Sequence, residues 1–524
     1  MSGHLLTVLI FLPTAGATLL LFFPRNAGRA AMWFATAVSI VELVLSIPLW
    51  TRFTPAVPGF QFSERVDWVP ALGISYSIGI DGISLLLILL TTVLTPISLM
   101  FSLTHVSREA KGFAIAFLTL ETGVLGTLCA LDLALFYVFW EVMLVPMYFI
   151  IGIWGGARRI YAAMKFFLFT MAGSLLMFLA ILYVAARHRA LTGSWSFLLS
   201  DLTRIDFPPA VQAILFFAFA LAFAIKVPVF PLHTWLPDAH TEAPTAGSII
   251  LAGVLLKLGV YGYLRFALPL FPESAMRYGP WVGALGVIGI VYGAMVAYPQ
   301  RDMKRLVAYS SVSHLGLVVV GVAAFTATSL SGAILQMVNH GLSTGALFLL
   351  VGVLYERRHT REIAAFGGIA GIVPVTTAFF LVATFSSIGL PGLNGFVGEF
   401  LILFGTWTSP HRWWAIIGAT GVILSAIYML TLVQRVFWNP LAHEENRELT
   451  DIRPTELVPA IALVLLMVWI GVRPNDVLDR IRPTVDALQT SVNARRSAAL
   501  RIDPQHGREP GAPPPMTSAG AAAR

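Results

Sequence analysis

The sequence contains little charge and a single cysteine. Only 12% of its 524 residues are charged, about half the share found in soluble domains, whereas 57% are hydrophobic. This balance excludes a soluble globular fold and indicates a polytopic membrane protein. With Cys129 as its one thiol, the chain alone can neither ligate an iron–sulfur cluster nor form an internal disulfide.

Nucleotide-binding motifs are also missing. No G-x-G-x-x-G follows a strand-like segment, and no P-loop lysine motif occurs. Any redox cofactors are therefore expected on partner proteins. The formal net charge of +7 does not indicate nucleic-acid binding, because most arginines fall in short loops or in the polar C-terminal tail.

What the sequence does contain is a series of apolar stretches near the length that spans a membrane. Each is long enough for a transmembrane helix and too long for a barrel strand, so we predict an all-α polytopic membrane protein with about 14 transmembrane helices. The stretches cover residues 5–23, 31–50, 79–103, 113–131, 133–154, 163–185, 212–237, 246–267, 280–298, 306–325, 330–355, 374–408, 415–437 and 456–472.

The distribution of lysine and arginine predicts the orientation of the chain. Loops after the odd-numbered stretches carry about twice as many of these residues as the other loops, so we expect them on the cytoplasmic side. Both termini are then periplasmic, in the inner (plasma) membrane of a bacterial cell. Pro24 and Arg25, rather than a small-residue cleavage site, follow the first stretch, which we therefore expect to be retained.

Stretches 4–8 and 9–13 form two blocks of five, and the fourth member of each block is interrupted. Because five is odd, the second block should cross the membrane inverted relative to the first. The expected division is 1–112 for helices 1–3, 113–267 for the first repeat, 280–437 for the inverted repeat, 438–475 for a loop and helix 14, and 476–524 for a polar tail that we expect to be disordered.

Both interruptions carry ionisable residues. In the first, Lys226 precedes Pro228 and Pro231, and in the second, Pro391 precedes Glu399. A charge near the bilayer centre costs about 2.5–3.5 kcal/mol on insertion scales. Proline also breaks the helical hydrogen-bond ladder, which lipid tolerates only where protein or a hydrated cavity satisfies the backbone. Broken helices with charges are typical of ion sites in membrane proteins.

Further ionisable residues lie near the centres of their stretches. Acids, lysines and imidazoles at one depth can hold and pass protons between neighbours, so the pattern predicts a proton relay. The candidates are Glu141, Lys226, Lys257, His314, His340 and Glu399, together with His233 and His240 in the first interruption.

Structural roles remain open for these residues. Glu141 and Lys226 could form an ion pair that only docks two helices, and Lys257 could snorkel toward the interface. The two mid-helix histidines could be satisfied interhelical hydrogen-bonders. Those in the first interruption could face a water channel or cap a half-helix, but their surroundings lack the carboxylate–histidine spacing of a metal site.

Five other charged residues stand out without a clear role in a relay. Glu42 and Glu121 also lie mid-stretch and have no evident partner. Asp302, Lys304 and Arg305 lie at a junction between a loop and a helix, where we expect them to orient that helix.

Four segments together resemble the antiporter-like subunits of respiratory complex I. The resemblance runs from about Asp81 to Glu399 and beyond. Within that family the chain is most similar to the M type (mitochondrial NADH dehydrogenase subunit 4 type), because its last interruption carries an acid and only a polar tail follows the last stretch. The segments are ALDLALFYVFWEVMLVPMYFIIGIWG, KVPVFPLHTWLPDAHTEAPTAGSIILAGVLLKLG, DMKRLVAYSSVSHLG and LPGLNGFVGE.

The resemblance implies a proton-translocating subunit of NADH:quinone oxidoreductase without a redox centre of its own. FMN, iron–sulfur clusters and quinone are then on partner subunits, and neighbouring antiporter-like subunits are the direct partners in the lipid bilayer. The implied roles are Glu141 and Lys226 as a pair, Lys257 as the central lysine, His314 and His340 as relay positions, His233 and His240 as a loop motif, and Glu399 as the last carrier. The alternatives are a subunit of a multi-subunit sodium/proton antiporter and a passive membrane scaffold.

Overall fold

The computed structural model describes residues 4–57, 59–441 and 443–502. Among these residues, twelve helices are long and apolar enough to cross a membrane, and Leu5–Leu21 and Pro374–Ser387 form shorter apolar helices. A multi-pass helical membrane fold is therefore confirmed, whereas the count of fourteen spans and the inverted repeats stay predictions.

The N-terminal half of the bundle contains the first interruption. Its helices are α1 (Leu5–Leu21), α2 (Gly28–Arg52), α3 (Gly82–Ser102), α4 (Ala110–Cys129), α5 (Leu133–Val142), α6 (Leu144–Trp154), α7 (Arg159–Thr192), α8 (Leu199–Leu202), α9 (Pro209–Lys226), α10 (Trp235–Glu242), α11 (Thr245–Ile250), η2 (Leu251–Leu255), α12 (Lys257–Gly262), η3 (Tyr263–Ala267) and α13 (Leu268–Leu270).

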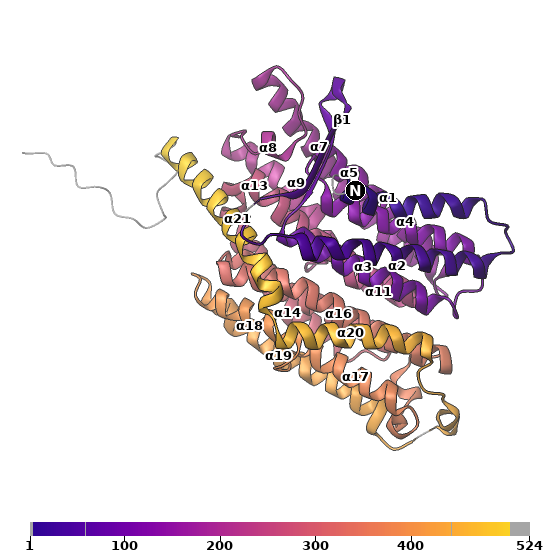
Figure 1. Ribbon diagram of the computed structural model, residues 1–524. Coiled ribbons are helices and arrows are strands. Elements are labelled where there is room, and N and C mark those ends of the chain that lie inside the picture. The colour runs from indigo at the N-terminus through magenta and orange to yellow at the C-terminus, as the bar shows by residue number, and fades with distance from the viewer. Residues whose placement is uncertain (1–3, 58, 442, 503–524) are drawn as a thin grey trace, which may run out of the picture.

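The C-terminal half packs beside it and contains the second interruption (Figure 1). Its first helix begins at Pro272 rather than near residue 280, because Pro280 is accommodated inside it. The helices are α14 (Pro272–Ala297), α15 (Met303–Ala324), α16 (Ala327–Arg358), η4 (Ile363–Ala365), η5 (Ile369–Gly371), α17 (Pro374–Ser387), α18 (Asn394–Trp407), α19 (Arg412–Val433), η6 (Gln434–Trp438), η7 (Glu444–Glu448), α20 (Pro454–Val472) and α21 (Asn475–Ile502).

Four elements form the centre of the bundle and are almost entirely buried: α3, α15, α16 and the continuous segment from α11 to α13. By contrast, α2, α7 and α20 bury only about a third of their apolar windows and present the rest outward, as expected for helices that face lipid. Small residues allow close contact in the C-terminal half, where a Cβ on Gly316 of α15 would meet the Gly286 carbonyl of α14 at 2.7 Å.

A β-hairpin that the sequence did not predict lies at one end of the bundle. Strand β1 (Gln61–Val69) pairs antiparallel with β2 (Ile74–Ile80), and Asp132 receives hydrogen bonds from the backbone and hydroxyl of Ser75 at 3.0 and 3.1 Å. We call this end the hairpin face. The opposite end, the loop face, is built from the segments at residues 22–27, 103–109, 155–158, 299–302, 359–373, 439–441 and 443–453.

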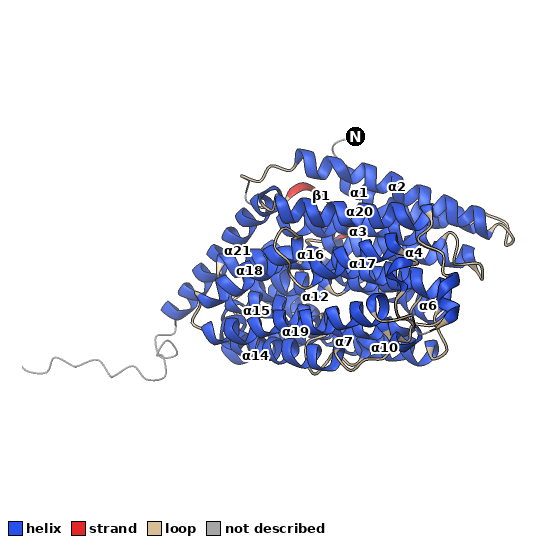
Figure 2. Cartoon of the chain, turned by 90° about the horizontal axis from the view of Figure 1, so that it is seen from below, coloured by secondary structure: helices blue, strands red, loops and turns tan. Residues whose placement is uncertain are grey.

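The expectation of a disordered tail from residue 476 is wrong for residues 475–502, which form helix α21. This helix leaves α20 and runs along the end of the bundle past both halves (Figures 1 and 2). The Thr484 hydroxyl accepts from Gly82 N at 3.1 Å, and Gln489 donates to the Phe325 carbonyl at 2.6 Å. The polar composition therefore reflects an amphipathic helix packed on the bundle, while residues 503–524 lie outside the described part.

Candidate functional site

The first interruption is stabilised by hydrogen bonds that replace the lost helical ladder. Helix α9 ends at Lys226, and the chain resumes as α10 at Trp235. The indole of Trp235 donates to the Ile225 carbonyl at 2.9 Å, and Val229 N donates to the Ala224 carbonyl at 2.9 Å. Because protein groups satisfy these carbonyls, the break can persist inside the membrane.

Lys226 is held mainly by aromatic rings. Its Nζ lies 5.2 Å from the ring centroid of Trp140 and 5.8 Å from that of Phe166, and only 2% of the residue is exposed. No ion pair within 4.0 Å between described residues involves Lys226, although the charge of Glu141 is near enough to act on it. The expected contact between Glu141 and Lys226 is therefore absent, because the two rings hold the ammonium.

Lys257 occupies a helical segment widened on both sides. The short helix α12 lies between the π-helices η2 and η3, a form of helix that is frequent at functional sites. The fully buried ammonium donates to the Ala252 carbonyl and lies 2.8 Å from Nδ1 of His340. The lysine is therefore bonded within the bundle and does not snorkel toward either face.

Two histidines connect Lys257 with Glu399. The ring centroids of His340 and His314 are 5.8 Å apart, and Nδ1 of His314 lies 3.3 Å from Oε1 of Glu399. Nε2 of His340 has no protein partner within the described residues. Since an imidazole can both donate and accept, the four side chains form a continuous line of titratable groups from α12 to α18.

Glu399 is fixed by a polar network at the second interruption. Gln336 donates to its Oε1 at 3.4 Å, while the Nε2 of His314 lies 3.3 Å from the Ser387 hydroxyl and 3.4 Å from that of Tyr428. Gly389 must remain small, since a Cβ there would meet Oε2 of Glu399 at 2.5 Å. The acid is thus positioned by α15, α16, α17 and α19 together.

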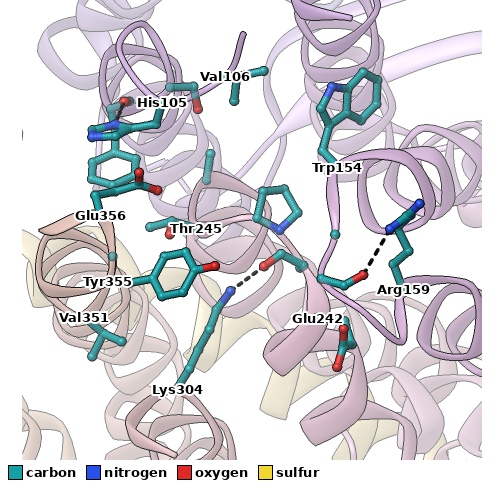
Figure 3. Close-up of a pocket in the computed structure, with 18 of the residues that line it drawn as sticks. His105, Val106, Trp154, Arg159, Glu242, Thr245, Lys304, Val351, Tyr355 and Glu356 are labelled. Atoms are coloured by element: carbon teal, nitrogen blue, oxygen red, sulfur yellow. Dashed lines mark hydrogen bonds between the residues drawn. The ribbon is translucent and has the colours of Figure 1, made fainter. Parts of the chain in front are cut away.

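A polar cavity of about 320 Å³ opens at the loop face (Figure 3). Glu242 and Lys304 line it, with 8% and 4% exposure, and the Lys304 ammonium donates to the Ala243 carbonyl. His240 lies near enough to both Lys304 and Lys257 for their charges to act on its ring, and neither of its ring nitrogens has a described protein partner. His240 therefore links a lysine that lines the cavity and a lysine of the buried line through their charges.

The structure brings four of the predicted site residues, Lys257, His340, His314 and Glu399, into contact in one line. Glu141, Lys226 and His233 do not contact it. His233 contacts the rings of Phe230 and Tyr292, at 5.8 and 5.0 Å between centroids, rather than the line.

At the start of α15 the prediction holds for two of three residues: Asp302 caps the helix by accepting from Arg305 N at 3.1 Å. Lys304 instead lines the cavity.

Sequence reasoning missed several polar neighbours of the line, namely Gln336, Ser387, Tyr428 and Glu242. A signal for the first was present, because Gln336, Asn339 and His340 recur at helical spacing inside an apolar stretch. The others come from separate helices, so no spacing in the sequence indicates them. Within the described ranges, no group of three or more His, Cys, Asp or Glu residues could hold a metal ion.

Two family models cover this arrangement. The transmembrane model of NADH:quinone oxidoreductase/Mrp antiporter matches residues 130–425, and the amino-terminal model of NADH-ubiquinone oxidoreductase chain 4 matches residues 9–131. The chain belongs to this family. The resemblance to antiporter-like complex I subunits is thereby confirmed.

Relatives extend over nearly the whole chain. NADH-quinone oxidoreductase subunit M of Rhodobacter capsulatus is 45% identical, over 94% of this chain and 97% of its own. NADH-ubiquinone oxidoreductase chain 4 of Marchantia polymorpha is 40% identical, over 92% and 96%.

Solved structures show the same fold. A chain of respiratory complex I from Thermus thermophilus superposes with a TM-score of 0.84 at 33% identity, covering 93% of this chain and 99% of its own. A chain of the Mrp complex from Dietzia has a TM-score of 0.77 at 24% identity; the match covers 96% of this chain but only 57% of that one.

Proposed function

We propose that this chain is the M-type, proton-translocating membrane subunit of a bacterial NADH:quinone oxidoreductase, located in the inner membrane with its loop face toward the cytoplasm. The observation that carries the proposal is the buried line from Lys257 through His340 and His314 to Glu399. The nearly full-length relatives named as subunit M support the same assignment.

In this proposal protons load from the loop-face cavity. Glu242 and Lys304 collect a proton from water in the cavity, and His240 passes it to Lys257. His340 and His314 then transfer it to Glu399 at the second interruption, from which it leaves on the hairpin face. Lys257 and His340 are 2.8 Å apart and His314 and Glu399 are 3.3 Å apart, so these two transfers are direct, and one bridging water serves the step between the two imidazoles.

Lys226 and Glu141 act beside this line as an electrostatic control. A shift of a neighbouring subunit changes the separation of the two charges. This change alters how strongly Lys257, on helix α12 that packs against α9, holds its proton. Moving one charge against the membrane potential takes about 2.3 kcal/mol per 100 mV. The driving energy comes from partner subunits that carry FMN, iron–sulfur clusters and the quinone site.

The test is NADH-driven proton uptake by inverted membrane vesicles that carry Lys257→Ala at the wild-type level of assembled complex. We expect proton uptake to fall to background while NADH oxidation by an artificial acceptor persists. Lys111→Ala is the matched control, since Lys111 donates only to the Leu21 and Phe23 carbonyls at the loop face. Unchanged proton uptake in Lys257→Ala would overturn the proposal.

The sodium/proton antiporter alternative rests on the shared fold with the Mrp chain. The same vesicles separate the two functions. A redox-driven proton pump takes up protons equally in sodium-free buffer, whereas an antiporter subunit needs a sodium gradient and no NADH.

A further inference from the structure

Two buried glutamates lie outside the line described above. Glu42 on α2 is 0% exposed and Glu121 on α4 is 2% exposed. All four of their carboxyl oxygens lack a hydrogen-bond partner among the described residues. A buried carboxyl group with no partner is costly, so the position requires an explanation.

The two carboxyl groups face each other where α2, α3 and α4 pack together. The charge of Glu121 acts directly on Glu42, and the Thr95 hydroxyl of α3 lies against Glu121. One turn away, the hydroxyls of Ser46 and Thr92 lie 3.0 Å apart across the α2–α3 contact. The surroundings are therefore hydroxyl groups and apolar side chains. The hydroxyl groups can form hydrogen bonds with a carboxyl group, but neither kind of side chain can neutralise a carboxylate.

No cation faces the pair within the part of the chain that the structure describes. Arg29 and Arg52 stand near opposite ends of α2, each at least ten residues from Glu42, which is about 15 Å or more along a helix. Lys111 is equally far from Glu121 on α4 and donates to backbone carbonyls at the loop face.

Other titratable groups on the elements that pack against α2 and α4 do not reach the pair either. Lys257 is bonded to Ala252 and His340. No hydrogen bond or ion pair between described residues joins any of these groups to Glu42 or Glu121. Besides Lys257, the titratable side chains on these elements are Tyr76, Cys129, Tyr137, Glu141, Tyr148 and Tyr261.

Two adjacent carboxylates in a low-dielectric site cannot both stay ionised without a counterion. We infer that Glu42 and Glu121 form a proton-binding site that holds at least one proton at neutral pH. The proton replaces the missing cation and supplies the donor through which one carboxyl group bonds to the other. Other buried pairs of carboxyl groups share protons in the same way.

This site is separate from the proposed relay. Leucines of α3 fill the space between them, since a Cβ on Gly253 would meet Leu94 at 2.3 Å and one on Gly341 would meet Leu90 at 2.7 Å. An apolar layer therefore lies between the pair and the Lys257–His340 contact, and the inference does not depend on the proposed function.

The test is infrared difference spectroscopy on the whole purified complex, comparing wild type with Glu42→Gln/Glu121→Gln at neutral pH in sodium-free buffer. We expect the wild type to show additional carbonyl absorption from one or two protonated carboxyl groups, shifted to lower frequency in D₂O. Glu109→Gln is the control, because Glu109 is exposed at the start of α4 and its loss should remove no protonated carbonyl.

Glutamine has the shape of a neutral glutamic acid, so the variants should assemble at wild-type level. If the double variant fails to assemble, the single variants give the same readout. Absence of a protonated carbonyl in the wild type would overturn the inference. Binding of radioactive sodium that the substitutions abolish would also overturn it, by making a metal ion the occupant.

Discussion

The two interruptions use opposite means to keep an ionisable group in the membrane. At the first, the Lys226 ammonium lies over the rings of Trp140 and Phe166 without an ion pair. At the second, Glu399 lies among His314, Gln336 and a close glycine. Aromatic faces attract a cation without fixing its direction, whereas directional hydrogen bonds fix the acid. The first break can therefore respond to a distant charge, and the second can transfer a proton at a fixed position.

The largest effect is expected at the second break. Glu399→Gln removes the ability to take up and release a proton, so NADH-driven proton uptake should fall to background, and Glu399→Asp should restore part of it. Proton uptake by vesicles, normalised to the amount of assembled complex, provides the measurement. Full proton uptake in Glu399→Gln would show that the proton does not pass through this acid.

The next test separates two histidines of the first break. His240→Gln should abolish most proton uptake because His240 is close enough to both Lys304 and Lys257 for their charges to act on its ring. His233→Gln should leave it nearly intact because His233 packs against Tyr292 away from the line. The same vesicle assay applies to both. Equal losses would mean that the loading path passes both residues.

A smaller effect is expected from the aromatic support of Lys226. Trp140→Leu removes a cation–π contact of about 0.5–2 kcal/mol, which corresponds to a change of roughly two- to thirtyfold in how strongly the charged form is favoured. We expect reduced proton uptake per NADH and unchanged artificial-acceptor activity. Trp140→Phe, which keeps an aromatic face, should restore much of the loss; if both variants match wild type, the aromatic contacts do not support Lys226.

The glycines of the second break offer a matched pair. Gly389→Ala and Gly392→Ala both place a side chain at positive φ, +76° and +94°, at a cost of about 1–2 kcal/mol. Only the first also displaces Glu399. Both variants should lower thermal stability similarly, but only Gly389→Ala should also reduce proton uptake. Equal uptake would indicate that Glu399 tolerates the displacement.

The smallest effect concerns the start of α17, which leads into the second break. Asp451 accepts hydrogen bonds from Val375 N, Thr376 N and the Thr376 hydroxyl at 2.8, 2.9 and 2.6 Å. Burial raises the pKa of Asp451, but these hydrogen bonds outweigh burial and hold its pKa below the ordinary value. Asp451→Asn should therefore cost about 1 kcal/mol of stability at neutral pH.

This contribution should depend on pH in a defined direction. A depressed pKa stabilises the fold above the unfolded value of about 3.9 and loses that effect as pH falls through the folded value. Thermal inactivation of wild type and Asp451→Asn should converge at acidic pH. If the difference in thermal inactivation between the two proteins stayed constant down to that pH, the stabilisation would come from the shape of the Asp451 side chain and not from its charge.

The sequence was sufficient for the membrane class, both interruptions and the four residues of the buried line, because a charge or a proline inside an apolar stretch is conspicuous wherever the chain folds. Their role as a relay stays a prediction. The sequence was misleading for residues 475–502, where polarity suggested disorder. Amphipathic helices that pack at a membrane surface can be as polar as a disordered tail. Only contacts such as that of Gly82 with Thr484 distinguish the two.

By itself, the sequence determined which groups are ionisable and that they lie at similar depth, since hydropathy fixes where a helix sits in the membrane. The tertiary structure decided which of them meet. His314 and His340 come from different helices, His233 and His240 from one short segment, yet the first two join the line and the second two separate. Which side chains meet depends on how each helix is rotated about its axis. Packing against all neighbouring helices sets this rotation, so no single segment of the sequence contains it.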